Sequence, residues 1–274
     1  MATPLGTHLR SLDEVLSHAR ELVLPPRPSI GARQATGDDG SAVRSVPWTD
    51  AAVGPLDVAA TLDAYLARSG HIERSDIRLL TRPRPSRQYV ILVDHSGSMV
   101  GRKLELAATM AAILAQLSDA GKADYAVLAF DEHVEEIKRL GDTRDADEVV
   151  DRILRLPEGR ATDLGQVFAA ATVLAAERPE STDVVLISDC MPTKGTTTFE
   201  GLAELARRIP SLYICFTDEQ SAAIQVFHGG QHLDIYQWWA RQWVGEERLA
   251  EVGDVTEVDH LVDLMSQEGS ETGP

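Results

Sequence analysis

Four short runs of mainly β-branched and aromatic residues, each followed by a stretch with helical periodicity, most constrain how this chain can fold. The runs occupy residues 89–93, 125–130, 184–188 and 212–216, and the helical patterns occupy residues 103–117, 146–156, 163–176 and 201–209. A strand that reads as one continuous apolar run is buried on both faces, which is typical of parallel sheets covered by helices on both sides. The sequence therefore predicts an α/β fold with a doubly wound, mostly parallel, Rossmann-like sheet.

Two further strands are expected near the edges of this sheet. Residues 134–140 alternate less cleanly and predict an antiparallel edge strand, whereas residues 248–252 and 258–265 predict a last strand and helix. We therefore place the main domain at residues 87–266 and a flexible tail at residues 267–274.

The part of the chain before the main domain has a different character. Apolar residues recur at helical intervals from Leu9 to Leu24, so residues 1–24 predict an N-terminal helical arm. Its polar face carries charges of both signs, which favours packing on the body of the protein over a membrane surface. Residues 25–54 are rich in Pro, Gly, Ser and Asp and predict a linker or an ordered arm, and residues 55–86 predict a helix and strand that lead into the domain.

The overall charge argues against one class of partner. The chain has 43 Asp and Glu residues against 26 Lys and Arg, a formal net charge of −17, which repels a phosphate backbone. Cys190 and Cys215 lack the spacing of a disulfide framework or a zinc site. No stretch has the ~20 apolar residues that span a bilayer, and the N-terminal residues lack a signal-peptide pattern. We therefore expect a cytoplasmic protein with no nucleic-acid or membrane partner.

Polar side chains gather where the predicted strands end. The first run ends in the string Asp94-His-Ser-Gly-Ser98, the third ends in Ser188-Asp189, and Thr162 precedes the helix at residues 163–176. In an extended chain the two-residue period puts Asp94, Ser96 and Ser98 on one side. Because ligands of open α/β sheets bind at the carboxyl ends of the strands, these side chains are expected to form one site.

All the side chains of this predicted site offer oxygen atoms. Oxygen ligands without His or Cys suit Mg2+, with Mn2+ or Ca2+ as alternatives. Asp94 and Asp189 would balance the charge of a divalent cation, while the hydroxyls of Ser96, Ser98 and Thr162 are neutral. A cation held mainly by neutral donors can accept another carboxylate from outside, which describes an adhesion site better than a hydrolytic one.

The string Asp94, Ser96, Ser98, followed by Thr162 and Asp189 at later loop and strand ends, resembles the metal-ion-dependent adhesion site of the von Willebrand factor A family. The resemblance covers roughly residues 87–265. It implies that the serine and threonine hydroxyls coordinate the cation, that one or both aspartates act through water, and that an acidic side chain of a partner takes the open position. Two positions depart from the family pattern: the threonine loop, often Gly-Gly-Thr, is Gly159-Arg-Ala-Thr162, and Cys190 stands where Gly is frequent.

The segment before the first strand resembles a subgroup of the family. Residues 56–62, the Asp76-Ile-Arg sequence and the arginines that follow are similar to the lead-in of intracellular bacterial members, such as the D-type subunit of magnesium chelatase and accessory proteins of carbon monoxide dehydrogenase. That resemblance implies an adaptor beside an AAA+ ATPase, in metal insertion or in protein or cofactor maturation. The partner offering an Asp or Glu to the metal would be the ATPase or a client protein, and this chain would not be an enzyme.

Two other functions are compatible with the same residues. One is a metal-dependent hydrolase or phosphatase, although no nucleophile or base is clearly tied to the metal residues and no Gly-rich phosphate loop is present. The other is a scaffold whose metal site is vestigial.

Several single residues also have two readings. His95 has the opposite parity from the site and is expected to pack structurally, and Asp163 is expected to cap its helix or to hydrogen-bond a metal ligand. The cluster of Trp238, Trp239 and Trp243 predicts an insertion packed on the body by its aromatic rings, with a docking surface as the alternative. The arginines at positions 74, 78, 82, 84 and 87 are expected to be paired, with a basic docking strip as the alternative.

Overall fold

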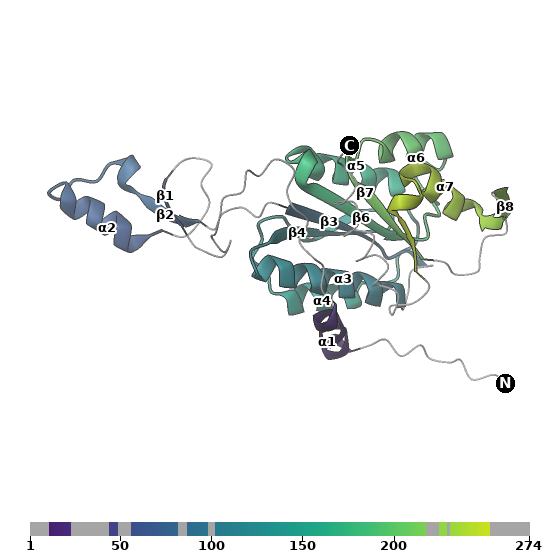
Figure 1. The fold of residues 1–274 in the computed structure, drawn as a ribbon, viewed down its shortest axis with the longest axis horizontal. Coiled ribbons are helices and arrows are strands. Elements are labelled where there is room, and N and C mark those ends of the chain that lie inside the picture. The colour runs from purple at the N-terminus through teal and green to yellow at the C-terminus, as the bar shows by residue number, and fades with distance from the viewer. Residues whose placement is uncertain are drawn as a thin grey trace, which may run out of the picture.

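A six-stranded sheet with helices on both faces forms the main domain (Figure 1). The computed structural model describes residues 11–22, 44–48, 56–81, 87–97, 102–217, 225–228 and 231–252. The strand order is β10-β7-β6-β3-β4-β5, with bounds β3 Arg87–Asp94, β4 Ala123–Phe130, β5 Val134–Lys138, β6 Thr182–Ser188, β7 Leu212–Phe216 and β10 Leu249–Glu251. All neighbours are parallel except β5, which pairs antiparallel with β4 at the edge. The predicted α/β fold and its antiparallel edge strand are confirmed.

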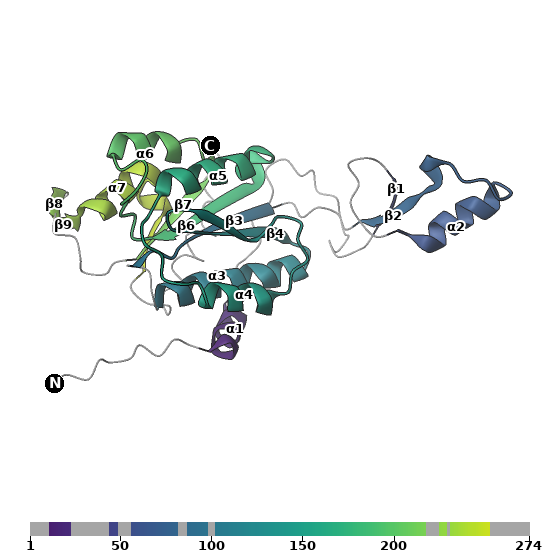
Figure 2. The ribbon, with the colours of Figure 1, turned by 180° about the vertical axis from the view of Figure 1, so that it is seen from behind.

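Two layers of helices cover the sheet, as Figures 1 and 2 show from opposite sides. One layer holds α3 (Arg102–Asp119) and α4 (Ala146–Leu154), and the other holds α5 (Leu164–Ala176), α6 (Phe199–Ala206) and α7 (Ile235–Val244).

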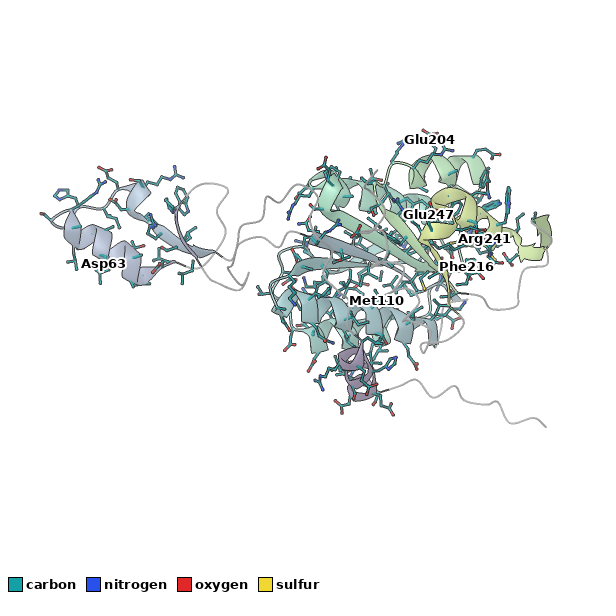
Figure 3. The ribbon with its side chains drawn as sticks, viewed as in Figure 1. Asp63, Met110, Glu204, Phe216, Arg241 and Glu247 are labelled. Carbon is teal, nitrogen blue, oxygen red and sulfur yellow. The ribbon has the colours of Figure 1, made fainter. Side chains whose placement is uncertain are left out.

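Successive residues of the central strand supply both layers. In β3, Tyr89, Ile91 and Val93 belong to the core under α3, where Met110 is fully buried (Figure 3), while Val90 and Leu92 belong to the core under α5 to α7. Both faces of the strand are apolar because both are covered, which accounts for its continuous apolar sequence.

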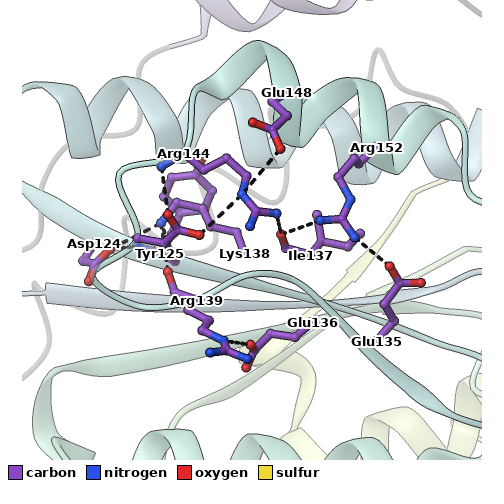
Figure 4. Close-up of polar contacts among 11 residues, drawn as sticks. Asp124, Tyr125, Glu135, Glu136, Ile137, Lys138, Arg139, Arg144, Glu148 and Arg152 are labelled. Atoms are coloured by element: carbon purple, nitrogen blue, oxygen red, sulfur yellow. Dashed lines mark hydrogen bonds and ion pairs between the residues drawn. The ribbon is translucent and has the colours of Figure 1, made fainter.

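Hydrogen bonds from buried and partly buried cations hold the edge strand β5 in place. Burial lowers the pKa of Lys138 on β5, and Asp124 opposes that shift. The Lys138 ammonium donates to the carbonyl of Tyr125 at 2.7 Å, and Arg152 on α4 donates to the carbonyl of Ile137 at 3.3 Å (Figure 4). These bonds tie the edge strand to its neighbours and to α4.

The N-terminal helix α1 (Leu12–Glu21) packs on the domain, as its two-signed polar face predicts. Ser11 begins it with a capping box, in which Ser11 and Glu14 bond each other's backbone amides. Val15 and Ala19 are fully buried in the core that contains α3 and α4, and the Gln116 side chain donates to the Ala19 carbonyl at 2.9 Å.

A small lead-in unit lies to one side of the main domain (Figure 1). It contains β1 (Arg44–Pro47), α2 (Val58–Ala67), the short helix η1 (Arg74–Asp76) and β2 (Arg78–Thr81), and β1 pairs antiparallel with β2. The sequence interpretation missed β1, which lies within the stretch expected to be a linker or arm, because four residues containing a proline carry little strand signal.

The described arginines of the expected pairing cluster all have partners within the chain. Arg74 stacks on Trp48 at 3.6 Å, Arg78 donates to the Ser45 carbonyl at 3.2 Å, and buried Arg87 lies 3.7 Å from Asp183. Arg82 and Arg84 lie outside the described residues. The three described arginines therefore have partners within the chain, and the ion pair of Arg87 is a buried one.

The tryptophans pack α7 onto the domain. A hairpin of β8 (Gln225–His228) and β9 (Gln231–Asp234) leads into α7. Trp243 meets the edge of Phe168 at 6.0 Å, and Trp238 stacks on Phe199 at 5.4 Å. The interpretation of this cluster as a packed insertion is confirmed.

The predicted last strand is present as β10, whereas the helix expected at residues 258–265 and the tail at 267–274 lie outside the described residues. Within the described part of the chain, no helix has the length and apolar character needed to cross a bilayer.

The burial of α1 predicts a difference between two chemically identical substitutions. Val15→Ala should lower the free energy of unfolding by about 1–3 kcal/mol, because it removes two buried methyl groups and leaves a cavity. The matched Val173→Ala change, on an α5 position that is exposed to solvent, should alter it by less than about 0.5 kcal/mol. Chemical denaturation measures both values, and equal effects would contradict the docking of α1.

Candidate metal centre

The candidate site lies where the direction of the chain through the sheet reverses. From β3 the chain passes to β4 on one side and later to β6 on the other side. The register pairs Val93 with Ile187, so Asp94 at the end of β3 lies beside Ser188 at the end of β6. Such a switch point opens a crevice at the carboxyl ends of the strands, where ligands of this fold class bind.

Asp94 is a fully buried carboxylate with a fixed orientation. Its Oδ1 accepts a hydrogen bond from the Ser96 amide at 2.9 Å, and its Oδ2 accepts one from the Ser188 hydroxyl at 2.6 Å. Burial, and secondarily the charge of Asp189, raise the pKa of Asp94 to about 6, while the bonds from Ser188 and Ser96 act in the opposite direction. A cation beside this carboxylate would favour its ionised form.

Ser188 is a site residue that the sequence interpretation did not single out as one. Besides donating to Asp94, its hydroxyl oxygen accepts from the Cys190 amide at 2.9 Å. The residue after Ser188 is Asp189, whose carboxylate accepts a hydrogen bond from the Met191 amide at 3.1 Å. The sequence shows that Ser188 ends an apolar run, but its contact with Asp94 follows only from the register between β3 and β6.

The backbone conformation at Cys190 is one that glycine adopts easily. Its φ of 56° lies in the left-handed region, where residues with a side chain are strained. The thiol is buried in the core under α5, and burial, together with the charges of Asp189 and Asp94, raises its pKa. Cys190 is therefore a core residue held as a neutral thiol, and the departure from glycine leaves the β6 end intact.

Gly159 brings the threonine loop against the end of β3. It forms a parallel bridge with Ser96, and its amide donates to the His95 carbonyl at 2.8 Å. A Cβ atom at Gly159 would lie 2.5 Å from the Cβ of Asp131, so this close approach requires glycine. The loop departs from Gly-Gly-Thr, but it keeps the one glycine that the contact needs, and Thr162 follows three residues later.

Two residues next to the site, His95 and Asp163, have structural roles. His95 is buried, and its Nδ1 lies 2.9 Å from the Pro157 carbonyl oxygen, so its predicted structural role is confirmed. Asp163 caps α5 by accepting from the Gln166 amide at 3.0 Å.

Four of the five predicted site residues lie in the described structure. Asp94 and Ser96 are joined directly, Asp189 acts electrostatically on Asp94, and Thr162 arrives through the loop bridged to Ser96. Asp94, Ser96 and Thr162 are buried. Ser98 lies outside the described residues.

The donor set fits a hard divalent cation. It combines two carboxylates with neutral hydroxyls, and such all-oxygen sets suit Mg2+, Mn2+ or Ca2+. No group of three or more His, Cys, Asp or Glu side chains that could hold a metal occurs among the described residues. A cation here would therefore depend on the hydroxyls as well as on Asp94 and Asp189.

The Ser188–Asp94 bond predicts an effect on metal binding that a second serine can control for. Ser211 donates to Asp183 at 2.7 Å in a similar Ser–Asp pair away from the site. Ser188→Ala and Ser211→Ala should each lower the free energy of unfolding by about 1–3 kcal/mol, because each removes one hydrogen bond that a buried carboxylate accepts. Only Ser188→Ala should also weaken Mn2+ binding, by roughly 10–100-fold, since it frees a carboxylate of the site.

Isothermal titration with Mn2+ and chemical denaturation measure the two effects. Equal Mn2+ affinity in both variants would contradict the assignment of Ser188 to the site.

Comparisons with known proteins found similar solved structures and one matching family model. Solved structures with similar folds include a von Willebrand factor type A protein from Catenulispora acidiphila, with 16% identity over 70% of this chain and a TM-score of 0.47. Proximal thread matrix protein 1 from the mussel byssus, in a structure with a zinc occupied MIDAS motif, has 13% identity over 66% of this chain and a TM-score of 0.48. BatB from Bacteroides thetaiotaomicron has 14% identity over 66% of this chain and a TM-score of 0.46, and the match covers 98% of the BatB chain.

This chain spans less than half of the Catenulispora and mussel chains, 44% and 48% respectively. A search of curated proteins gave no significant match.

A family model described as VWA domain containing CoxE-like protein matches residues 39–226. All five predicted site positions, including Ser98, fall within this region, as does the described lead-in unit. Because the match covers well over half of the 274 residues, the chain belongs to the family of VWA domain containing CoxE-like proteins.

Proposed function

We propose that this protein is a Mg2+-dependent protein-interaction module whose cation holds a carboxylate of a partner protein. The residues that would hold the cation are Asp94, Ser96, Ser98, Thr162 and Asp189. The partner is an AAA+ ATPase or its client, and the chain is a non-catalytic adaptor in metal insertion or in protein or cofactor maturation. Membership of the VWA family, a known class of metal-dependent interaction modules, supports the general statement. The ATPase partner rests on the resemblance of the lead-in segment.

The observation that carries the proposal is the fixed, buried carboxylate of Asp94. Both of its oxygens accept hydrogen bonds, from Ser96 and Ser188, while the second carboxylate, Asp189, lies near enough to raise its pKa. Two carboxylates placed together at a switch point are costly without a cation. When bound, the cation supplies the positive centre that an incoming acidic side chain needs.

The overall charge supports the same mode of binding. A chain with a formal net charge of −17 repels an acidic partner at long range. Recognition of a carboxylate therefore requires a local positive centre at the contact, and the hydroxyl-rich donor set leaves a cation with positive charge to offer.

A second surface also favours protein contact. Six of the eight large apolar side chains that are exposed in the described structure lie in the lead-in unit, namely Leu56, Val58, Leu62, Tyr65, Leu66 and Ile72. Asp63 lies on the same helix, α2 (Figure 3). Exposed apolar residues gathered in this way mark interaction sites on soluble proteins.

The alternative function, a hydrolase or phosphatase built on the same residues, has less support. Its base would have to come from the vicinity of the site, and His95, the histidine next to Asp94, is buried with its Nδ1 against the Pro157 carbonyl. Turnover of a generic phosphate ester that is lost in Asp189→Ala would favour this alternative.

Replacing the buried carboxylate should separate metal binding from folding. Asp94→Asn keeps the shape of the side chain and removes a charge that is costly to bury, so the free energy of unfolding without metal should not fall. Binding of Mn2+ should fall by at least about 100-fold, since one of only two charged ligands is lost. Titration calorimetry with Mn2+ measures this, with the exposed surface variant Glu204→Ala as a control that should bind like the unmodified protein.

The partner contact should depend on the same carboxylate. Affinity capture from native cells in Mg2+ buffer should retain an AAA+ ATPase, and either EDTA or Asp94→Asn should release it. Mass spectrometry of the retained proteins gives the result. Retention of the same ATPase in EDTA would contradict the metal-dependent contact while leaving metal binding itself untouched.

A further inference from the structure

We propose that Thr193 is the positioning residue that orients Thr162 toward the metal site. This inference rests on the proposed metal-binding function and adds to it a residue outside the predicted ligand set. Thr193 belongs to the loop that follows Asp189, and Thr162 belongs to the loop before α5.

Three hydrogen bonds join these two loops. The Thr162 amide donates to the Thr193 hydroxyl oxygen at 2.8 Å. In the reverse direction, the Thr162 carbonyl accepts from the amides of Thr193 at 3.0 Å and Lys194 at 3.1 Å. The backbone of Thr162 is therefore held on both its donor and its acceptor side, and the backbone conformation sets the direction in which a side chain leaves the chain.

The neighbouring contacts hold the same two loops in register. Gly195, with a φ of 66°, packs so closely on Asp163 that a Cβ atom would lie 2.4 Å from its carboxylate oxygens. The Asp163 amide donates to the Asp131 carbonyl at 2.9 Å. Lys194 forms an ion pair with Glu132 at 2.6 Å, which joins the loop between β4 and β5 to this assembly.

The two loops together set the spacing between a carboxylate and a hydroxyl of the site. Asp189 and Thr193 are four residues apart on one loop, and Thr193 fixes Thr162 on the other. A metal site needs its ligands prearranged, and residues that bond the ligands commonly change metal affinity by 10–100-fold when they are replaced. Thr193 would act in this way through its hydroxyl, because its side chain is exposed and does not belong to the core.

This arrangement can be tested with substitutions that differ only in the hydroxyl. Thr193→Val keeps the shape of the side chain but leaves the amide of buried Thr162 without its acceptor. Thr193→Ser keeps the hydroxyl. Thr197→Val makes the same chemical change at an exposed position four residues further along this loop and serves as the matched control.

The measurement is the Mn2+ dissociation constant of the full chain, obtained by electron paramagnetic resonance of free Mn2+, together with melting temperatures without metal. Thr193→Val should weaken Mn2+ binding roughly tenfold or more, while Thr193→Ser and Thr197→Val should bind like the unmodified protein. Mn2+ affinity is measured well below the melting temperature of every variant, so that the loss of affinity in Thr193→Val is not caused by unfolding.

Three other outcomes would each contradict part of the proposal. Absence of Mn2+ binding by the unmodified protein would overturn the proposed function. Mn2+ binding that is unchanged in Thr193→Val would overturn only the role of Thr193. If Thr193→Ser loses affinity as Thr193→Val does, the hydroxyl is not the cause, and the inference also fails.

Discussion

The hydrogen bond from Ser188 to the buried Asp94 carboxylate is the interaction on which the rest of the site depends. It joins the ends of β3 and β6, the two strands between which the chain reverses its direction through the sheet. Because both strands are buried on both faces, a charged group can be placed there only with donors already in position. The bond at 2.6 Å, with that from the Ser96 amide, provides those donors and leaves Asp189 beside them.

The loops around this bond form a connected frame. Gly159 in the threonine loop forms a bridge with Ser96. The loop after Asp189 hydrogen-bonds to the backbone of Thr162 through Thr193. Each contact joins residues that are far apart in the sequence, and together they bring oxygen atoms from three separate segments to the carboxyl ends of β3 and β6. The two apolar cores of the main domain underlie this frame, and neither includes a described residue of the lead-in unit.

Much of this architecture could be predicted from the sequence, because the strands of the main domain are continuous apolar runs and its helices have clear periodicity. Asp94, Ser96, Ser98 and Asp189 could be chosen because they follow two of those runs, and Thr162 because it precedes a helix. The strand β1 and the hairpin of β8 and β9 could not, since four-residue strands with polar or proline residues carry too little pattern.

The missed site residues have a different cause. Ser188 and Thr193 contact their partners across separations of 94 and 31 residues. Their roles come from the strand register and from the way two loops fold together, which no local sequence pattern encodes. The Gly159 contact is similar, because its need for glycine arises from Asp131 on another loop.

In the proposed function, Asp94, Ser96, Ser98, Thr162 and Asp189 surround one divalent cation. Anomalous diffraction from crystals of the protein grown with Mn2+ tests it most directly. We expect a manganese peak at the carboxyl ends of β3 and β6, with the Ser96 and Thr162 hydroxyl oxygens at coordination distances of roughly 2.0–2.6 Å. A well-diffracting crystal with no peak there, or with manganese bound only elsewhere, would contradict it.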